Sequence, residues 1–120
     1  MRKLDLGHTS IEDAELSRLA QFTALQDLNL QLTPITDAGI ESLGKLTNLQ
    51  TLWLTSTKIS DAGLEKLAGL KKLQSLHIES TAVTKAGKQR LQKLLPSTQI
   101  SLDGDDNIFS LDTFEVFPSE

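Results

Sequence analysis

A repeat of 24 residues is the feature that most constrains the fold of this chain. Leu25, Leu49 and Leu73 each begin the same pattern, and the first two of these segments share about half of their residues. Self-similarity at a fixed period of this length is typical of solenoids, so each unit is expected to stack on the next. The spacing divides the chain into repeats 1–24, 25–48, 49–72 and 73–96, followed by a fifth strand in 97–102.

The first part of each repeat is expected to form a short strand. Its LxxLxL pattern alternates apolar and polar side chains, as in residues 28–30, which suits a strand with one buried face. A threonine follows in each turn, and we expect these threonines to form a hydrogen-bonded ladder along the inside of the turn, because backbone polar groups there need partners. They are Thr9, Thr33, Thr57 and Thr81.

The second part of each repeat is expected to form a short helix. Thr36, Ser60 and Thr84 stand where a helix N-cap belongs, and Asp37 and Asp61 follow in the first turn, where a carboxylate favours the helix dipole. Apolar residues then recur at helical spacing, and a glycine lies early in three of the helices, where it allows close approach of neighbouring coils. The apolar positions are Ile40, Leu43 and Leu46, then Leu64, Leu67 and Leu70; the glycines are Gly39, Gly63 and Gly87.

A strand and a short helix bury their apolar faces only by stacking on a copy of themselves. The strands must then lie side by side and parallel, with the helices outside. The expected fold is therefore a right-handed α/β solenoid, with a parallel sheet on its concave face and short helices on its convex face.

The repeat consensus LxxLxLxxTxITDAGLxxLxxLxx resembles that of bacterial leucine-rich-repeat proteins and is similar to the cysteine-containing type found with F-box proteins. The resemblance covers residues 1–102, with threonine in place of the usual asparagine or cysteine at the turn. It implies a scaffold that recognises a protein or peptide through its concave sheet. It implies no particular partner, because the family is defined by its fold.

The outward side chains of the LxxLxL segments form the predicted binding face. Trp53 is the only tryptophan and stands where a side chain faces solvent, and exposed aromatics are typical anchors of interfaces. The alternative is that its indole only lies flat over neighbouring side chains. The predicted partner-binding residues are Asp27, Asn29, Gln31, Thr51, Trp53, Thr55, Ser75, His77, Glu79 and Ser101.

Catalysis and metal binding are weakly supported. His77, Ser101 and Asp103 make the strongest hydrolytic arrangement, but an open sheet supplies no dependable pocket or oxyanion hole. The segment 103–107 begins like a calcium loop, yet Ile108 stands where that loop needs glycine, and its final glutamate is also missing. We therefore expect no enzyme activity, no metal and no cofactor.

Charge and composition narrow the partners further. The net charge is −4, but the segment 103–120 holds six acids and no base, which leaves 10 acids against 12 bases in residues 1–102. This nearly neutral body lacks the concentrated basic face that nucleic-acid binding needs. The chain has no cysteine, no long apolar run and no secretory signal, so we expect no membrane partner and favour a cytoplasmic location.

The two ends raise different expectations. Repeat 1–24 has no capping segment before it, so Leu4, Leu6 and Ile11 lack an upstream cover; we expect either a fragment of a longer protein or self-association through this end, as a stacking segment or homodimer. The acidic, phenylalanine-containing segment 103–120 is expected to be a C-terminal cap, and the alternative is a motif that docks on a partner.

Overall fold

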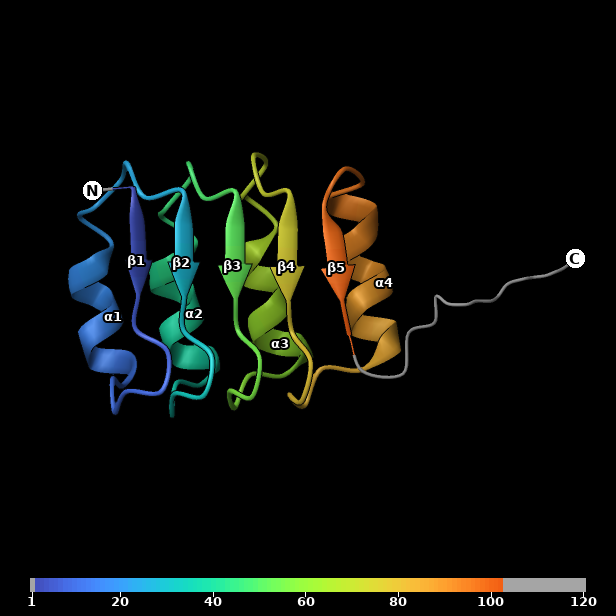
Figure 1. The fold of residues 1–120 in the computed structure, drawn as a ribbon. Coiled ribbons are helices and arrows are strands. Elements are labelled where there is room, and N and C mark those ends of the chain that lie inside the picture. The colour runs from blue at the N-terminus through green and yellow to red at the C-terminus, as the bar shows by residue number, and fades with distance from the viewer. Residues whose placement is uncertain (1, 103–120) are drawn as a thin grey trace, which may run out of the picture.

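A computed structural model describes residues 2–102 of the chain. The predicted cap or docking motif, Asp103 and the calcium-like sequence therefore lie outside the described residues. The described part holds one parallel sheet with its strands in chain order (Figure 1). The strands are β1 (Lys3–Asp5), β2 (Asp27–Asn29), β3 (Thr51–Trp53), β4 (Ser75–His77) and β5 (Gln99–Ser101).

The pairing of the strands repeats the period of the sequence. Leu28 pairs with Leu52, which pairs in turn with Leu76, so each residue lies beside its counterpart in the next repeat. Identical registers keep every inward leucine on the core side, since a slip of one residue would turn it to the other face. The predicted parallel arrangement is confirmed.

The helices all lie behind the sheet in the view of Figure 1, so they cover one face and leave the other open. They are α1 (Asp13–Leu19), α2 (Asp37–Leu43), α3 (Asp61–Leu64), which continues as the 3₁₀ turn η1 (Glu65–Leu67), and α4 (Lys85–Leu94). None of the helices among residues 2–102 is both long and apolar enough to cross a membrane. The α/β solenoid predicted from the repeats is confirmed.

Two helices, α2 and α3 with its 3₁₀ extension, are shorter than the apolar spacing predicts. Helix α2 ends at Leu43, with Gly44 as its C-cap, and Leu46 lies beyond it in a turn. Leu70 likewise follows η1. Both leucines are nevertheless fully buried, because the chain carries them inward as it returns to the next strand. The helical periodicity therefore predicted burial correctly and helix length wrongly.

The core is a strip that runs through all the repeats. Each inner repeat contributes its strand leucines, its turn isoleucine and its helical leucines, such as Leu52, Ile59 and Leu64, all with no exposed area. At the β1 end, Leu4, Leu6 and Ile11 are only partly buried. Burying an aliphatic side chain contributes about 2 kcal/mol, so the strip supplies the main driving force for folding.

The predicted threonine ladder is wrong. The hydroxyl of Thr33 donates to the carbonyl of Leu30, and that of Thr57 to the carbonyl of Leu54, each three residues earlier in the same repeat. Both threonines are buried. Their bonds close the turn within a coil and make no link from one coil to the next.

A carboxylate at the start of each of the first three helices makes a side-chain link to the next coil. The carboxylate of Asp37 accepts hydrogen bonds from the backbone N–H of Ser60, at 2.7 Å, and from its hydroxyl. Asp61 accepts the same pair of bonds from Thr84, with the N–H bond at 2.8 Å. We call this contact the coil clamp. Its members are Asp13 with Thr36, Asp37 with Ser60, and Asp61 with Thr84.

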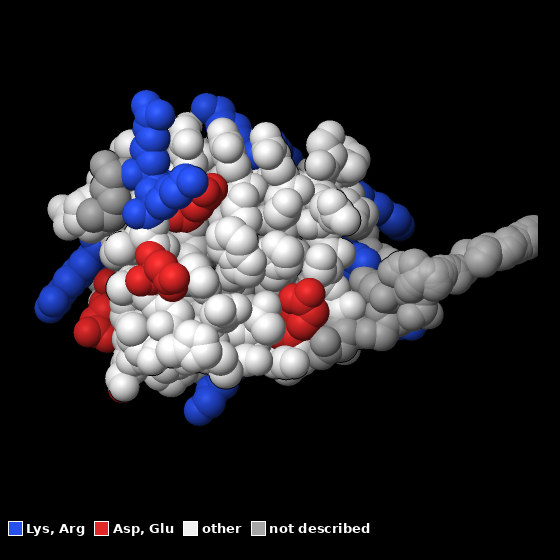
Figure 2. All heavy atoms as spheres, in the orientation of Figure 1, with Lys and Arg blue, Asp and Glu red and all other residues white. Residues whose placement is uncertain are grey.

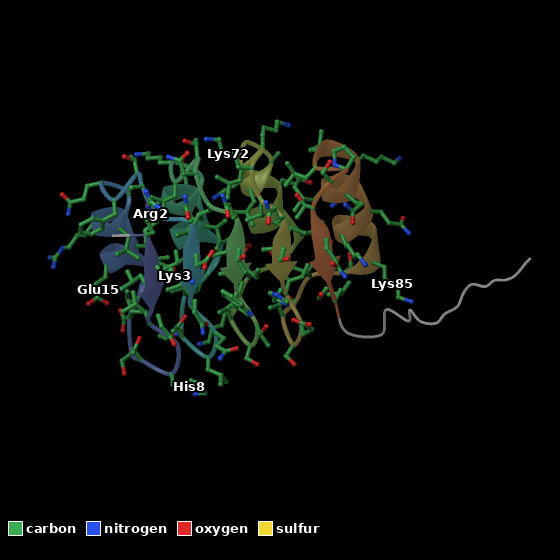
Figure 3. All side chains as sticks on the ribbon, turned by 45° about the horizontal axis from the view of Figure 1, so that its top comes forward. Arg2, Lys3, His8, Glu15, Lys72 and Lys85 are labelled. Carbon is green, nitrogen blue, oxygen red and sulfur yellow. The ribbon has the colours of Figure 1, made fainter. Side chains whose placement is uncertain are left out.

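The glycines of the helices make room for the coil clamp. A Cβ atom placed on Gly63 would overlap the Asp37 carboxylate, and one on Gly87 would overlap that of Asp61. This explains the close approach that the sequence suggested. The first repeat has Glu15 at the equivalent position, and Figure 3 shows it at the outer side of α1, away from the other coils.

Replacing Gly63 with alanine should break one clamp. The added methyl group displaces the Asp37 carboxylate from Ser60, and loss of hydrogen bonds to a charged group costs about 2 kcal/mol of unfolding free energy. Gly69→Ala is the matched control, because no atom lies within 4 Å of a Cβ placed there, and its effect should stay within about 0.5 kcal/mol. Urea unfolding measures both, and equal effects would show that the clamp contributes nothing.

The clamp of Asp61 should weaken in acid. The hydroxyl and then the backbone N–H of Thr84 lower the pKa of Asp61 below its ordinary value; burial opposes this and Arg90 assists it. A carboxyl whose folded pKa is lowered stabilises the protein above its unfolded pKa, and this contribution disappears as the pH falls through the folded pKa. The stability difference between wild type and Asp61→Asn should therefore shrink below about pH 4 in urea unfolding. A difference that does not change with pH would contradict this.

Candidate functional site

The ten predicted binding residues lie together on the face of the sheet opposite the helices, here called the open face. All are half-buried. Asp27, Thr51 and Ser75 form one column of paired residues; Asn29, Trp53, His77 and Ser101 form the next; Gln31, Thr55 and Glu79 follow directly after the strands.

Trp53 and His77 form an aromatic stack in the central column. Their ring centroids are 5.4 Å apart and their planes differ by 4°. The stack follows from the register, because Trp53 on β3 pairs with His77 on β4. Stacking holds the indole upright on the sheet and covers the face that it turns toward β4. Such a pair contributes about 1 kcal/mol beyond its buried area.

A hollow of about 410 Å³ lies on the other side of Trp53, over β1 and β2. Short side chains on these strands stand beside the large indole, which closes the hollow at its β3 side. The lining residues are Lys3, Leu4, Asp5, Asp27, Asn29 and Trp53.

Charge on the open face gathers at the same end. Lys3 forms an ion pair with Asp27 at 3.7 Å, and its side chain is 81% exposed. Asp5 accepts a hydrogen bond of 2.9 Å from the N–H of Gly7. Figure 2 shows that the middle of this face carries no charged side chain, while a further acidic group lies over its β4 side. Glu79, which follows β4, accepts a 3.0 Å hydrogen bond from the Thr55 hydroxyl.

The hollow brings in residues that the sequence prediction did not include. Lys3, Leu4 and Asp5 line it, although the predicted site began at Asp27. The repeat pattern predicts that the side chains of Lys3 and Asp5 point outward, so their place on the open face follows from the sequence. The depth of the hollow beside Trp53 does not follow from the sequence, because it depends on how the side chains of three strands differ in size.

Leu32 is a further exposed residue outside the predicted site. It is 49% exposed and has a φ of 56°. A positive φ strains a leucine, yet the equivalent residues of the other repeats share this backbone, so the turn itself imposes it. The signal in the sequence was a large apolar residue at a position where His8, Ser56 and Ser80 are polar.

The open face gives little support to hydrolysis. His77 and Ser101 are register partners, but the ring of His77 stacks on Trp53, and within residues 2–102 no hydrogen bond joins it to Ser101. Asp103, the third member of that hypothesis, lies outside the described residues. In the described part of the chain, no group of three or more histidine, aspartate or glutamate side chains is placed to hold a metal ion.

The repeats match a known family model. The model, described as a leucine-rich repeat, matches residues 23–44 and again 45–68. These segments cover α2 and the run from β3 to η1, where the consensus is most regular. No curated protein matches the chain.

Several solved structures share the fold. A leucine-rich-repeat protein of Leptospira interrogans superposes with a TM-score of 0.68 at 24% identity, over 84% of this chain and 25% of that one. Internalin C2 of Listeria monocytogenes gives 0.65 at 27% identity, over 85% of this chain and 51% of its own. The Mex67:Mtr2 subunits of Chaetomium give 0.64 at 22% identity, over 85% and 79%. The chain thus spans about a quarter and about half of the two bacterial proteins.

Proposed function

We propose that this chain, a leucine-rich-repeat protein of the bacterial type, holds a protein or peptide ligand on its open face, around Trp53. Leucine-rich repeats are in general protein-binding scaffolds. The observation that carries the proposal is the upright indole of Trp53, stacked on one side by His77 and bordered on the other by the hollow. Rigid aromatic side chains beside a recess are the usual anchors of interfaces.

The size of the open face favours a peptide or a short protruding segment. Strands about 4.8 Å apart, each presenting about three residues, give only a few hundred Å² of contact area. A stable interface between two globular proteins buries about 800 Å² on each side. An extended segment makes better use of such a narrow strip, because it follows the columns of side chains.

Binding should be lost when Trp53 becomes arginine. We expect a pull-down from the native host's extract to recover a partner with the wild type and not with Trp53→Arg, because the cation removes the anchor and fills the hollow. Loss of a central aromatic anchor costs about 2 kcal/mol or more, which lowers affinity at least about thirtyfold.

The control is Glu41→Arg, which adds the same side chain at an exposed position of α2, on the opposite side of the solenoid. It should retain the partner, and circular dichroism should show all three proteins folded. If the wild type and Trp53→Arg recover the same partners, recognition uses a surface other than the open face around Trp53.

A second candidate function is structural. Leu4, Leu6 and Ile11 are only partly buried, whereas the equivalent residues of the next repeat are fully buried. This apolar end of the strip favours contact with another coil, either in a larger repeat protein or in a second copy of the chain.

Sedimentation over a range of concentrations separates the two candidates. Self-association through the β1 end should raise the sedimentation coefficient with concentration, and the increase should persist in Trp53→Arg. A sedimentation coefficient that stays at the monomer value at every concentration would contradict a homodimer formed through the β1 end.

A further inference from the structure

The hollow beside Trp53 is both acidic and aromatic, and this combination specifies a ligand chemistry. Asp5 and Asp27 line it, and Lys3 is the one base among its described lining residues, so this lining carries more negative than positive charge. The indole face that borders it is electron-rich, and cations bind favourably over such a face. An anionic side chain would meet two carboxylates here.

We propose that the hollow receives the lysine or arginine side chain of an extended peptide, with its cation against Trp53 and between Asp5 and Asp27. This inference rests on the proposed function of the open face and names the chemistry of its ligand. Residues 103–120 contain six acids and no base, so that part of the chain itself supplies no such cation.

The order of the strands determines which face of the indole is available. His77 on β4 covers one side of Trp53, whereas the hollow lies over β1 and β2 on the other. A side chain that enters the hollow therefore meets the uncovered face.

The carboxylates retain capacity to accept hydrogen bonds. Each ionised aspartate offers about four acceptor positions. Asp5 uses one for the N–H of Gly7, and, within residues 2–102, Asp27 pairs with the exposed ammonium of Lys3 at 3.7 Å. An exposed ion pair of this kind contributes little, so a ligand cation can replace Lys3 at small cost. Figure 3 shows Arg2 and Lys3 projecting at the start of β1, at the edge of this region.

The test begins with a random displayed-peptide library selected on the immobilised full chain. The best peptide is then synthesised and titrated against the protein, with the emission of the single tryptophan as the signal. We expect the peptide to contain a lysine or arginine whose replacement by norleucine, or by a neutral isostere of arginine, weakens binding about tenfold. This peptide-side change leaves the protein fold untouched.

The protein-side variant is the double substitution Asp5→Asn and Asp27→Asn, which removes both charges and keeps the side-chain shapes. It should also weaken binding about tenfold, and added salt should weaken binding to the wild type more than to the variant. Glu41→Gln is the control: it removes one acid at an exposed position of α2, on the opposite side of the solenoid, and should change affinity less than about twofold.

The failures of the two proposals are distinguishable. Selected peptides that bind Trp53→Arg as well as the wild type would overturn the proposed function itself. Peptides that need Trp53 but tolerate norleucine at every basic position would overturn only the cation site. Equal losses in Glu41→Gln and in the double variant would also overturn it, because they would show a general effect of charge.

Discussion

One carboxylate in each of the first three repeats, reaching from the start of a helix to the next coil, is the contact on which the helical side of this solenoid depends. Asp37 occupies the space that a side chain at residue 63 would fill, so the clamp and the glycine require each other. The paired strands provide the other line of attachment between coils. Two lines of attachment on opposite sides of the leucine strip prevent a coil from sliding or rotating against its neighbour, and the strip packs the same way in each repeat.

The site is a consequence of that regularity. Since equivalent residues lie directly beside each other, any outward side chain is placed against its counterparts at about 4.8 Å. At the central position this sets Trp53 against His77 on one side, where the rings stack, and against the shorter Asn29 on the other. The hollow arises from this inequality of neighbours, because a large side chain stands beside small ones on a flat lattice.

The sequence predicted the lattice well and the contacts between coils poorly. Strand positions, registers and the outward columns follow from a period that is plain in one chain. The hydrogen-bond partners of side chains do not follow from this period. A threonine in a turn has several acceptors within reach, and Thr33 bonds within its own repeat rather than to the next one. The sequence predicts that Asp37 and Asp61 favour the helix dipole, whereas their hydrogen bonds cross to the neighbouring coil. Helix lengths were overestimated because burial at helical spacing continues past Leu43 into a turn.

The predicted binding residues lie together, but the recess that Asp5 and Lys3 line depends on side-chain sizes across three strands.

The aromatic and charged groups lie on different parts of the open face, and this separation affects how the face would recognise a peptide. The indole and imidazole lie over β3 and β4, and the carboxylates that line the hollow lie over β1 and β2. Buried aromatic area supplies affinity, whereas charges at a wet rim mainly select partners and orient them. In the proposed binding mode, Trp53 anchors the peptide, and Asp5 and Asp27 determine the position along the peptide at which the cation binds. Reversing the peptide would place that cation over the uncharged middle of the face or near Glu79 alone, so the unequal distribution of charge gives this short sheet a direction.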